Sequence, residues 1–264
     1  MGAFAATGSE IGLIFLGEIL GTMLLIILGN GVVASVKFKN MFAKLTAPNW
    51  VLITFAWGFA VLVGVIVAQA FKAPGYLNPA VTVYDLVGNI GVLANKGKAI
   101  GLFLLYVLGQ FIGAMLGQVV LNFINWNHIK DSTNADLKGS SCTGPAYANA
   151  TGRNFSYEFV GTAVLIGVIL AIGKNPSLSN LGPIPVTLLV VSIGMSLGSS
   201  TGYAINPARD LGPRMVYALT QKFFLSSREQ TSPDFKYGLI VPGAAPMLAG
   251  ILIGLIPLAL SLAK

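Results

Sequence analysis

Charged side chains are scarce in this sequence of 264 residues: 16 Lys and Arg and 9 Asp and Glu make up only 9% of it. Soluble globular domains carry roughly 25% charged residues, so this chain has too few to cover a surface exposed to water. Hydrophobic residues make up 55% of the sequence, and its mean hydropathy is +0.77. These values exclude a soluble enzyme and a disordered chain, and they indicate a protein whose solvent is the lipid bilayer.

Cysteine is also nearly absent, and basic residues do not cluster. The single cysteine, Cys142, cannot form an internal disulfide, which excludes a disulfide-stabilised secreted scaffold. The net charge is +7, but the Lys and Arg residues are scattered without a basic arm or stripe, so we expect no nucleic-acid partner. The first residues lack the basic region of a cleaved signal peptide and lead into an apolar stretch that is too long for one. We therefore expect this stretch to remain as the first membrane span.

Apolar stretches long enough to cross a membrane can be located by the absence of charge. A helix of about 20 residues crosses the hydrocarbon core of a bilayer. Six stretches qualify, of which the first is interrupted by Glu18: 11–36, 50–71, 99–124, 155–173, 184–201 and 237–263. The segment 125–154 between the third and fourth stretches is the longest polar region, and we expect it to be a loop. The sequence thus predicts an all-α membrane protein.

Two further apolar segments are too short to span a membrane, and both contain the tripeptide Asn-Pro-Ala. The first comprises Asn78, Pro79 and Ala80, and the second comprises Asn206, Pro207 and Ala208. Asn before Pro favours a helix start, because Asn caps the first turn and Pro tolerates the first helical position. We expect two half-helices. The irregular backbone before each of them is tolerated at membrane depth only when it is buried in protein or lines a water-filled cavity.

The sequence also indicates a duplication. Glu18 begins the segment EILGT, Glu158 begins the similar segment EFVGT, and each precedes its own Asn-Pro-Ala box. We expect one channel domain over residues 1–264, with a first repeat at about 10–125 and a second at about 154–263, joined by 125–154. Three spans per repeat would insert the second repeat upside down, so the two half-helices would approach from opposite faces.

Glycines at intervals of four residues predict close helix packing at two places. One set comprises Gly109, Gly113 and Gly117, and the other comprises Gly194, Gly198 and Gly202. Such stripes of small residues allow membrane helices to touch.

Two Asn-Pro-Ala boxes in an inverted repeat resemble the aquaporin, or major intrinsic protein, family over nearly the whole chain. The second box continues into Arg209 and Asp210, and an Asp after the Arg is similar to the glycerol-facilitator (aquaglyceroporin) branch. The resemblance implies six spans and two re-entrant half-helices. It also implies that Asn78 and Asn206 meet near the bilayer midplane and donate hydrogen bonds to the permeating molecule.

The resemblance further implies a selectivity filter and supporting groups. Arg209 would be its cation and Trp57 and Tyr203 its aromatic residues, while Gly194 would widen it by having no side chain. Tyr76 stands where the family commonly has His, and Tyr203 where glycerol-conducting relatives often have Phe. Glu18 and Glu158 have two interpretations: proton coupling, as for other acids inside a membrane, or support of the re-entrant loops, which the resemblance implies. Asp210 lies in the first turn of a half-helix, where the helix dipole favours a negative charge and where it could hold Arg209 or a loop N–H group.

The function implied is a passive channel for glycerol, other small uncharged solutes and water that excludes ions and protons. It requires no nucleophile, metal or cofactor, so we expect no enzyme. The resemblance also implies a homotetramer in the cell membrane. A water-selective aquaporin is one alternative, disfavoured by Gly194 and Asp210, and a coupled secondary transporter is another, because inverted repeats with broken helices and buried acids also describe that class.

Overall fold

The computed structural model describes residues 4, 6–45 and 49–263, so a few positions of the expected 1–264 domain lie outside the described part. Within these ranges the protein is built of helices and turns, without a strand. The main helices are α1 (Ser9–Lys37), α2 (Asn49–Ala70), α3 (Pro79–Asn89), α4 (Lys96–Ile124), α7 (Thr151–Gly173), α9 (Ile184–Leu197), α10 (Pro207–Phe224) and α12 (Ala245–Leu262). Shorter segments are η2 (Phe42–Leu45), α5 (Trp126–Asp131), α6 (Asn134–Ser141), α8 (Pro176–Ser179), α11 (Phe235–Gly238) and the π-helical η3 (Leu239–Ala244).

Five helical segments in the described ranges are long and apolar enough to cross a membrane: Glu10–Lys37, Asn49–Ala70, Lys96–Ile124, Thr151–Gly173 and Phe235–Leu262. The fifth predicted span, 184–201, is shorter than expected, because α9 has 14 residues and ends at Leu197. At 1.5 Å per residue this helix is about 21 Å long. It stops where Gly198 caps it and the chain turns through Gly202, whose φ of +82° favours glycine.

The last span is continuous in the chain but not regular. The segments α11, η3 and α12 follow one another, and Pro242 lies inside the π-helical turn of η3. Proline has no N–H to donate to the preceding turn, and π-bulges are a common way for a helix to accommodate such a disturbance. At its start, a Cβ on Gly238 would lie 2.6 Å from Nε of Arg214, so this position needs glycine.

The first glycine stripe packs two helices closely, as predicted. A Cβ on Gly109 would lie 3.1 Å from the Phe15 ring, and one on Gly117 would lie 2.6 Å from the carbonyl oxygen of Met23. The stripe therefore brings α4 against the backbone of α1. The prediction for the second stripe was wrong in part, because α9 ends at Leu197: Gly198 is its C-cap and Gly202 lies beyond it.

The segment 125–154 is not the simple polar loop that the sequence predicts. It contains α5 and α6, and it is tied to α1 because Asn30 Nδ2 donates to the carbonyl oxygen of Ser141 at 2.8 Å. Leu137 of α6 is fully buried. Burial of this kind depends on contacts distant in the chain, which local polarity does not reveal.

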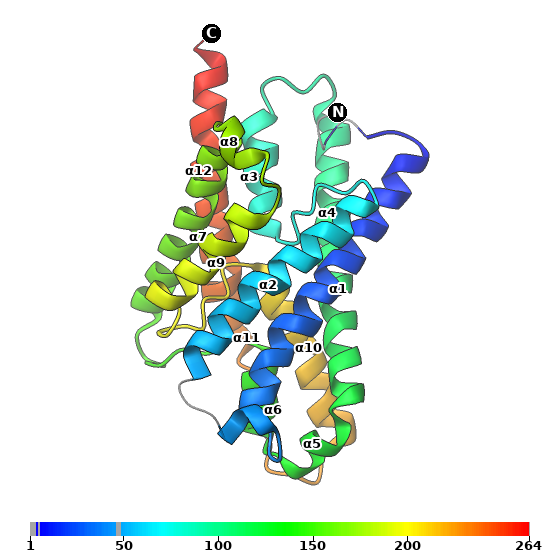
Figure 1. The fold of residues 1–264 in the computed structure, drawn as a ribbon, viewed down its shortest axis with the longest axis vertical. Helices are drawn as coiled ribbons and strands as arrows, with labels where there is room; N and C mark the ends of the chain where they lie inside the picture. Colours follow the sequence, from blue (N-terminus) through cyan, green and yellow to red (C-terminus); the bar gives the residue numbers. More distant parts are fainter. Residues whose placement is uncertain (1–3, 5, 46–48, 264) are drawn as a thin grey trace.

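The two short helices that follow the Asn-Pro-Ala boxes lie in opposite halves of the molecule along its long axis (Figure 1). Helix α3 lies toward the end where α1 begins and α12 finishes, and α10 lies toward the end that carries α5 and α6. The N-termini of α3 and α10 therefore face the middle of the protein from opposite directions.

Candidate functional site

Each half-helix begins at the asparagine of its box. Asn78 Oδ1 accepts a hydrogen bond from the Ala80 N–H at 2.9 Å, and Asn206 Oδ1 accepts from the N–H groups of Ala208 and Arg209 at 3.1 and 3.2 Å. A proline follows each cap at the first helical position. The local chemistry is the one the sequence predicts: the amide oxygen satisfies the orphan N–H groups of the first turn.

The same two asparagines join the two halves of the chain. Asn78 Nδ2 donates to the carbonyl oxygen of Ile205 at 2.8 Å, and Asn206 Nδ2 donates to the carbonyl oxygen of Leu77 at 2.7 Å. Each side-chain amide has two N–H donors, of which this contact uses one. Because both asparagines also line a cavity, the second donor of each is left for a molecule inside it.

The residues before the asparagines have a costly backbone conformation. Leu77 has φ 53° and Ile205 has φ 41°, in the left-handed region that costs a non-glycine residue roughly 1–2 kcal/mol. Two buried carboxylates hold these turns. Glu18 accepts from the N–H groups of Tyr76 and Leu77, both at 2.9 Å, and Glu158 accepts from those of Ala204 and Ile205 at 3.0 and 2.6 Å.

Side-chain donors complete both carboxylate sites. Gln110 Nε2 donates to Glu18 at 2.8 Å, and the Thr201 hydroxyl donates to Glu158 at 2.6 Å. The two glutamates are 0% and 1% exposed, so water is not available to replace these bonds. Their geometry is that of anchors for the re-entrant loops.

Two cavities meet at one ring of residues. The first, of about 530 Å³, is lined by Asn78, Asn206 and a long apolar wall, and it extends to Asp85 and Lys174. The second, of about 730 Å³, is lined at the opposite end by a mixture of polar, small and apolar residues, among them Lys138, Thr143 and Ile53. Trp57, Tyr203 and Arg209 line both cavities. These three side chains therefore stand at the junction of a path through the protein.

Arg209 is held against an aromatic face at this junction. Its guanidinium carbon lies 4.0 Å from the centroid of the Trp57 ring, close enough for a cation–π contact. Its side-chain nitrogens have no hydrogen-bond partner among the residues that the structure describes. The guanidinium therefore offers its N–H donors to the contents of the cavities.

Gly194 faces the Tyr203 ring and does not line either of the two cavities described above, so its effect on the width of the opening stays a prediction. A Cβ at this position would lie 2.8 Å from Cζ of Tyr203 and 2.9 Å from Cγ2 of Thr54. The Tyr203 ring thus fills the space that Gly194 leaves, and Trp50 meets this ring edge-on at 5.9 Å between centroids. The glycine makes room for the tyrosine, and the tyrosine lines the path.

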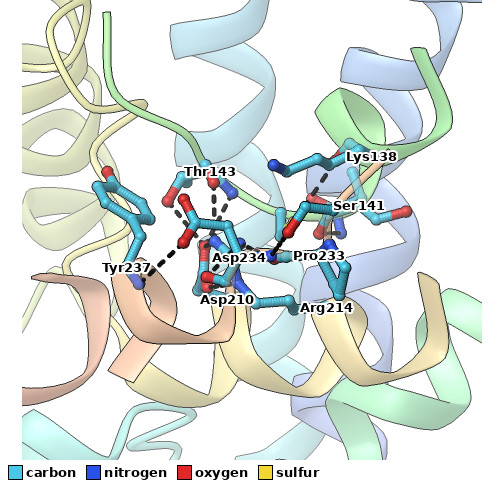
Figure 2. Close-up of polar contacts among 11 residues, drawn as sticks. Lys138, Ser141, Thr143, Asp210, Arg214, Pro233, Asp234 and Tyr237 are labelled. Carbon is cyan, nitrogen blue, oxygen red and sulfur yellow. Dashed lines mark hydrogen bonds and ion pairs between the residues drawn. The ribbon is translucent and has the colours of Figure 1, made fainter. Parts of the chain in front are cut away.

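Asp210 does not contact Arg209 in the way that one sequence hypothesis suggests. Its carboxylate accepts from Nε and Nη2 of Arg214 at 2.7 and 3.0 Å, and from the N–H and hydroxyl of Thr143 at 2.8 and 2.7 Å (Figure 2). Arg214 also donates to the carbonyl oxygens of Thr143 and Pro233 at 2.8 and 2.6 Å. Asp210 therefore holds a loop N–H, the second of the two partners that the sequence suggests, and fixes the loop that lines the second cavity to α10.

Sequence reasoning missed several of these groups. Arg214 follows Asp210 by four residues on a helix, and this spacing is a recognisable signal for an ion pair. Thr143 and Gln110 carry no comparable signal, because their partners are distant in the sequence and become neighbours only on folding.

Cys142 lies beside the second cavity, outside the spanning segments, and is 5% exposed. Burial raises the pKa of its thiol to about 12, and the negative charge of Asp210 acts in the same direction. The group is therefore an unreactive thiol at neutral pH. Among the described residues no group of three or more His, Cys, Asp or Glu side chains is arranged to hold a metal ion.

Comparison with known proteins agrees with this architecture. A family model described as major intrinsic protein matches residues 10–256. The chain is 49% identical over 243 residues to a "Probable glycerol uptake facilitator protein" of Mycoplasmoides gallisepticum, covering 91% of this chain and 94% of that protein. It is 40% identical over 237 residues to a "Glycerol uptake facilitator protein" of Streptococcus pneumoniae, covering 89% and 94%.

A solved structure has the same fold. The aquaglyceroporin from Plasmodium falciparum superposes with a TM-score of 0.75 at 24% identity, covering 93% of this chain and 95% of that one. Together with the apolar helices, these matches make the protein an integral, multi-pass membrane protein. The chain belongs to the major intrinsic protein family.

Proposed function

We propose that this protein is a passive channel for glycerol and other small uncharged solutes, together with water. The observation that carries the proposal is the ring of Trp57, Tyr203 and Arg209 where the two cavities meet, with Asn78 and Asn206 beyond it. The relatives named as glycerol uptake facilitators support glycerol as the solute. The two homologous halves, about 10–125 and 154–263, each contribute one asparagine.

The ring has one charged and two aromatic members, which suits a polyol. Glycerol has an edge of hydroxyl groups and an edge of C–H groups. Arg209 donates to the hydroxyl oxygens, while the rings of Trp57 and Tyr203 pack against the carbon backbone. Binding stays weak because the solute keeps few partners at a time, and a conducting site needs weak binding for release.

Ions meet an unfavourable potential on the same path. Each half-helix N-terminus carries the equivalent of about half a positive elementary charge and points to the middle of the pore. Arg209 adds a full charge, and Coulomb interactions are stronger in a poorly hydrated constriction than in water. Asn78 and Asn206 both donate to the same central region, so water molecules on its two sides are oriented oppositely and a proton relay is interrupted.

The remaining parts of the proposal follow from this mechanism. Passage makes and breaks no covalent bond, so the channel is not an enzyme and uses no metal or cofactor. We place it in the cell membrane as a homotetramer in which each subunit has its own pore. Glu18, Glu158 and Asp210 act as supports of the pore loops.

Stopped-flow light scattering on proteoliposomes tests the proposal. Vesicles containing the purified protein are expected to swell in an inward glycerol gradient much faster than protein-free vesicles. Swelling no faster than the protein-free control, with rapid water flux retained, would favour a water-selective channel and reject the proposal. Accumulation of glycerol against its gradient that collapses with an uncoupler would favour a coupled transporter.

A further inference from the structure

One carboxylate that lines the first cavity, that of Asp85, has no role in the proposed channel mechanism. Asp85 lies two turns after Asn78 on α3 and lines the first cavity together with Val81, one turn before it on the same helix face, and the adjacent Tyr84. It is the acidic side chain of that cavity wall among the residues that the structure describes, at the end away from Arg209. Nothing in the filter mechanism requires an acid there.

Asp85 is held in place by neighbouring groups. Its Oδ1 accepts from Asn89 Nδ2 at 2.9 Å, and its Oδ2 accepts from the hydroxyl of Tyr76. The Tyr76 ring is fixed in turn, because it stacks on Phe4 at 6.4 Å and meets Tyr106 edge-on at 5.8 Å between centroids. Glu18 holds the backbone N–H of Tyr76, so the hydroxyl and the carboxylate form one preorganised pair.

The pair has acceptor capacity left for a molecule in the cavity. An ionised carboxylate has about four lone-pair positions, and the hydrogen bonds from Asn89 and Tyr76 use only some of them. The cavity wall also includes apolar side chains, among them Val65, Ile169 and Val186. This end therefore combines polar and apolar surface, as the Arg209 ring does, but with opposite polarity: Arg209 only donates hydrogen bonds, whereas Asp85 only accepts them.

We propose that Asp85 and the Tyr76 hydroxyl form a second polyol site, which accepts hydrogen bonds from solute hydroxyl groups at the end of the pore opposite Arg209. The proposal rests on the proposed glycerol channel and names a further selectivity-determining group in it. A hydroxyl group both donates and accepts, so a polyol satisfies the donor site at Arg209 and the acceptor site at Asp85 in turn. A solute with fewer hydroxyl groups gains less from the second site.

The test compares glycerol with 1,2-propanediol, which has one hydroxyl fewer, in the same proteoliposomes. The ratio of the two permeabilities does not depend on how much folded protein each preparation holds. Asp85→Leu is expected to lower the glycerol to propanediol ratio by about tenfold, near the lower end of the equilibrium effect of losing one hydrogen bond to a charged group. Asp85→Asn keeps the volume and one acceptor oxygen, so its ratio should fall less.

Tyr76→Phe is the matched second variant, because it removes the hydroxyl and keeps the stacked ring. Its ratio should fall in the same direction as that of Asp85→Leu. A ratio unchanged in both Asp85→Leu and Tyr76→Phe, in vesicles that conduct glycerol, would overturn the second site and leave the channel proposal standing. Wild-type vesicles that conduct no glycerol would overturn both. Glycerol permeability that rises when sodium is replaced by N-methylglucamine would assign the pair to a cation and also overturn the proposal.

Discussion

The contact between Gly194 and Tyr203 predicts that a single methyl group added at Gly194 slows the passage of glycerol past the Tyr203 ring. In Gly194→Ala the new Cβ would lie 2.8 Å from Cζ of Tyr203 and 2.9 Å from Cγ2 of Thr54. Non-bonded carbons prefer roughly 3.5–4.0 Å, so the ring must retreat by roughly 0.7–1.2 Å. Helix α9 blocks one side of the ring, and Trp50 stands at its edge, so the open direction is into the path that Tyr203 lines.

The expected size of the effect follows from the cost of overpacking. Forcing an extra methyl group into a packed site typically costs about 1–3 kcal/mol. If the ring must be pushed back for each glycerol to pass, a barrier increase of about 1.4 kcal/mol slows passage tenfold. We therefore expect glycerol permeability to fall about tenfold or more, and water permeability to fall less because water is smaller.

Stopped-flow measurement of both permeabilities, with a double variant, makes this prediction specific. Gly194→Ala combined with Tyr203→Ala removes the ring that the methyl group displaces, so glycerol permeability should recover. Gly167→Ala is the matched control, since a Cβ there would meet nothing within 4 Å on α7. Wild-type glycerol permeability in Gly194→Ala would refute the reasoning, as would a double variant no faster than the single one.

Three other predictions concern the supports of the pore. Glu158→Gln replaces an acceptor of three hydrogen bonds by a group with only one acceptor oxygen, so it should lower the free energy of unfolding by about 2–4 kcal/mol. Thermal unfolding measures this loss, and an uncoupler-sensitive glycerol flux that disappears in the variant would instead indicate proton coupling. Arg214→Leu leaves Asp210 buried with Thr143 as its remaining partner and should cost about 3–5 kcal/mol, again by thermal unfolding, whereas an unchanged midpoint would mean that the pair contributes nothing. Because burial raises the pKa of Cys142 to about 12, its thiolate is rarer at pH 8 than that of an ordinary thiol. N-ethylmaleimide should therefore label the native protein slowly at pH 8 and faster toward pH 12, and it should label the denatured protein rapidly. Equal labelling rates of native and denatured protein at pH 8 would contradict the burial of Cys142.

Much of the pore could be predicted because its signals are local. Asn followed by Pro at the start of a short apolar segment specifies a capped helix, and both half-helices begin at the expected residue. The charge-poor stretches likewise give the long spans within a few residues. In each case the residues that determine the local conformation are neighbours in the sequence.

The features that could not be predicted depend on groups that meet only in the folded protein. The family resemblance gives Gly194 a position near Tyr203, but it does not reveal that the Tyr203 ring occupies the space that a side chain at this position would need. Helix α9 ends at Leu197 because the chain then turns back and packs Tyr203 against Gly194 of the same helix. For Asp210 the sequence left two partners open, Arg209 or a loop N–H group, and only the fold shows that the carboxylate binds the Thr143 N–H and Arg214.

Through the hydrogen bonds of Asn78 and Asn206, each half of the chain stabilises the loop before the half-helix of the other half. Asn78 satisfies the carbonyl oxygen of Ile205, and Asn206 satisfies that of Leu77, so each strained residue belongs to one half and is bonded by the asparagine of the other. The left-handed backbone at Leu77 and Ile205 costs roughly 1–2 kcal/mol per residue, and a half without its partner would also leave a carbonyl group unsatisfied in a dry interior. The orientation of the pore asparagines is therefore a property of the pair of repeats, and an inverted duplication supplies both members in one chain.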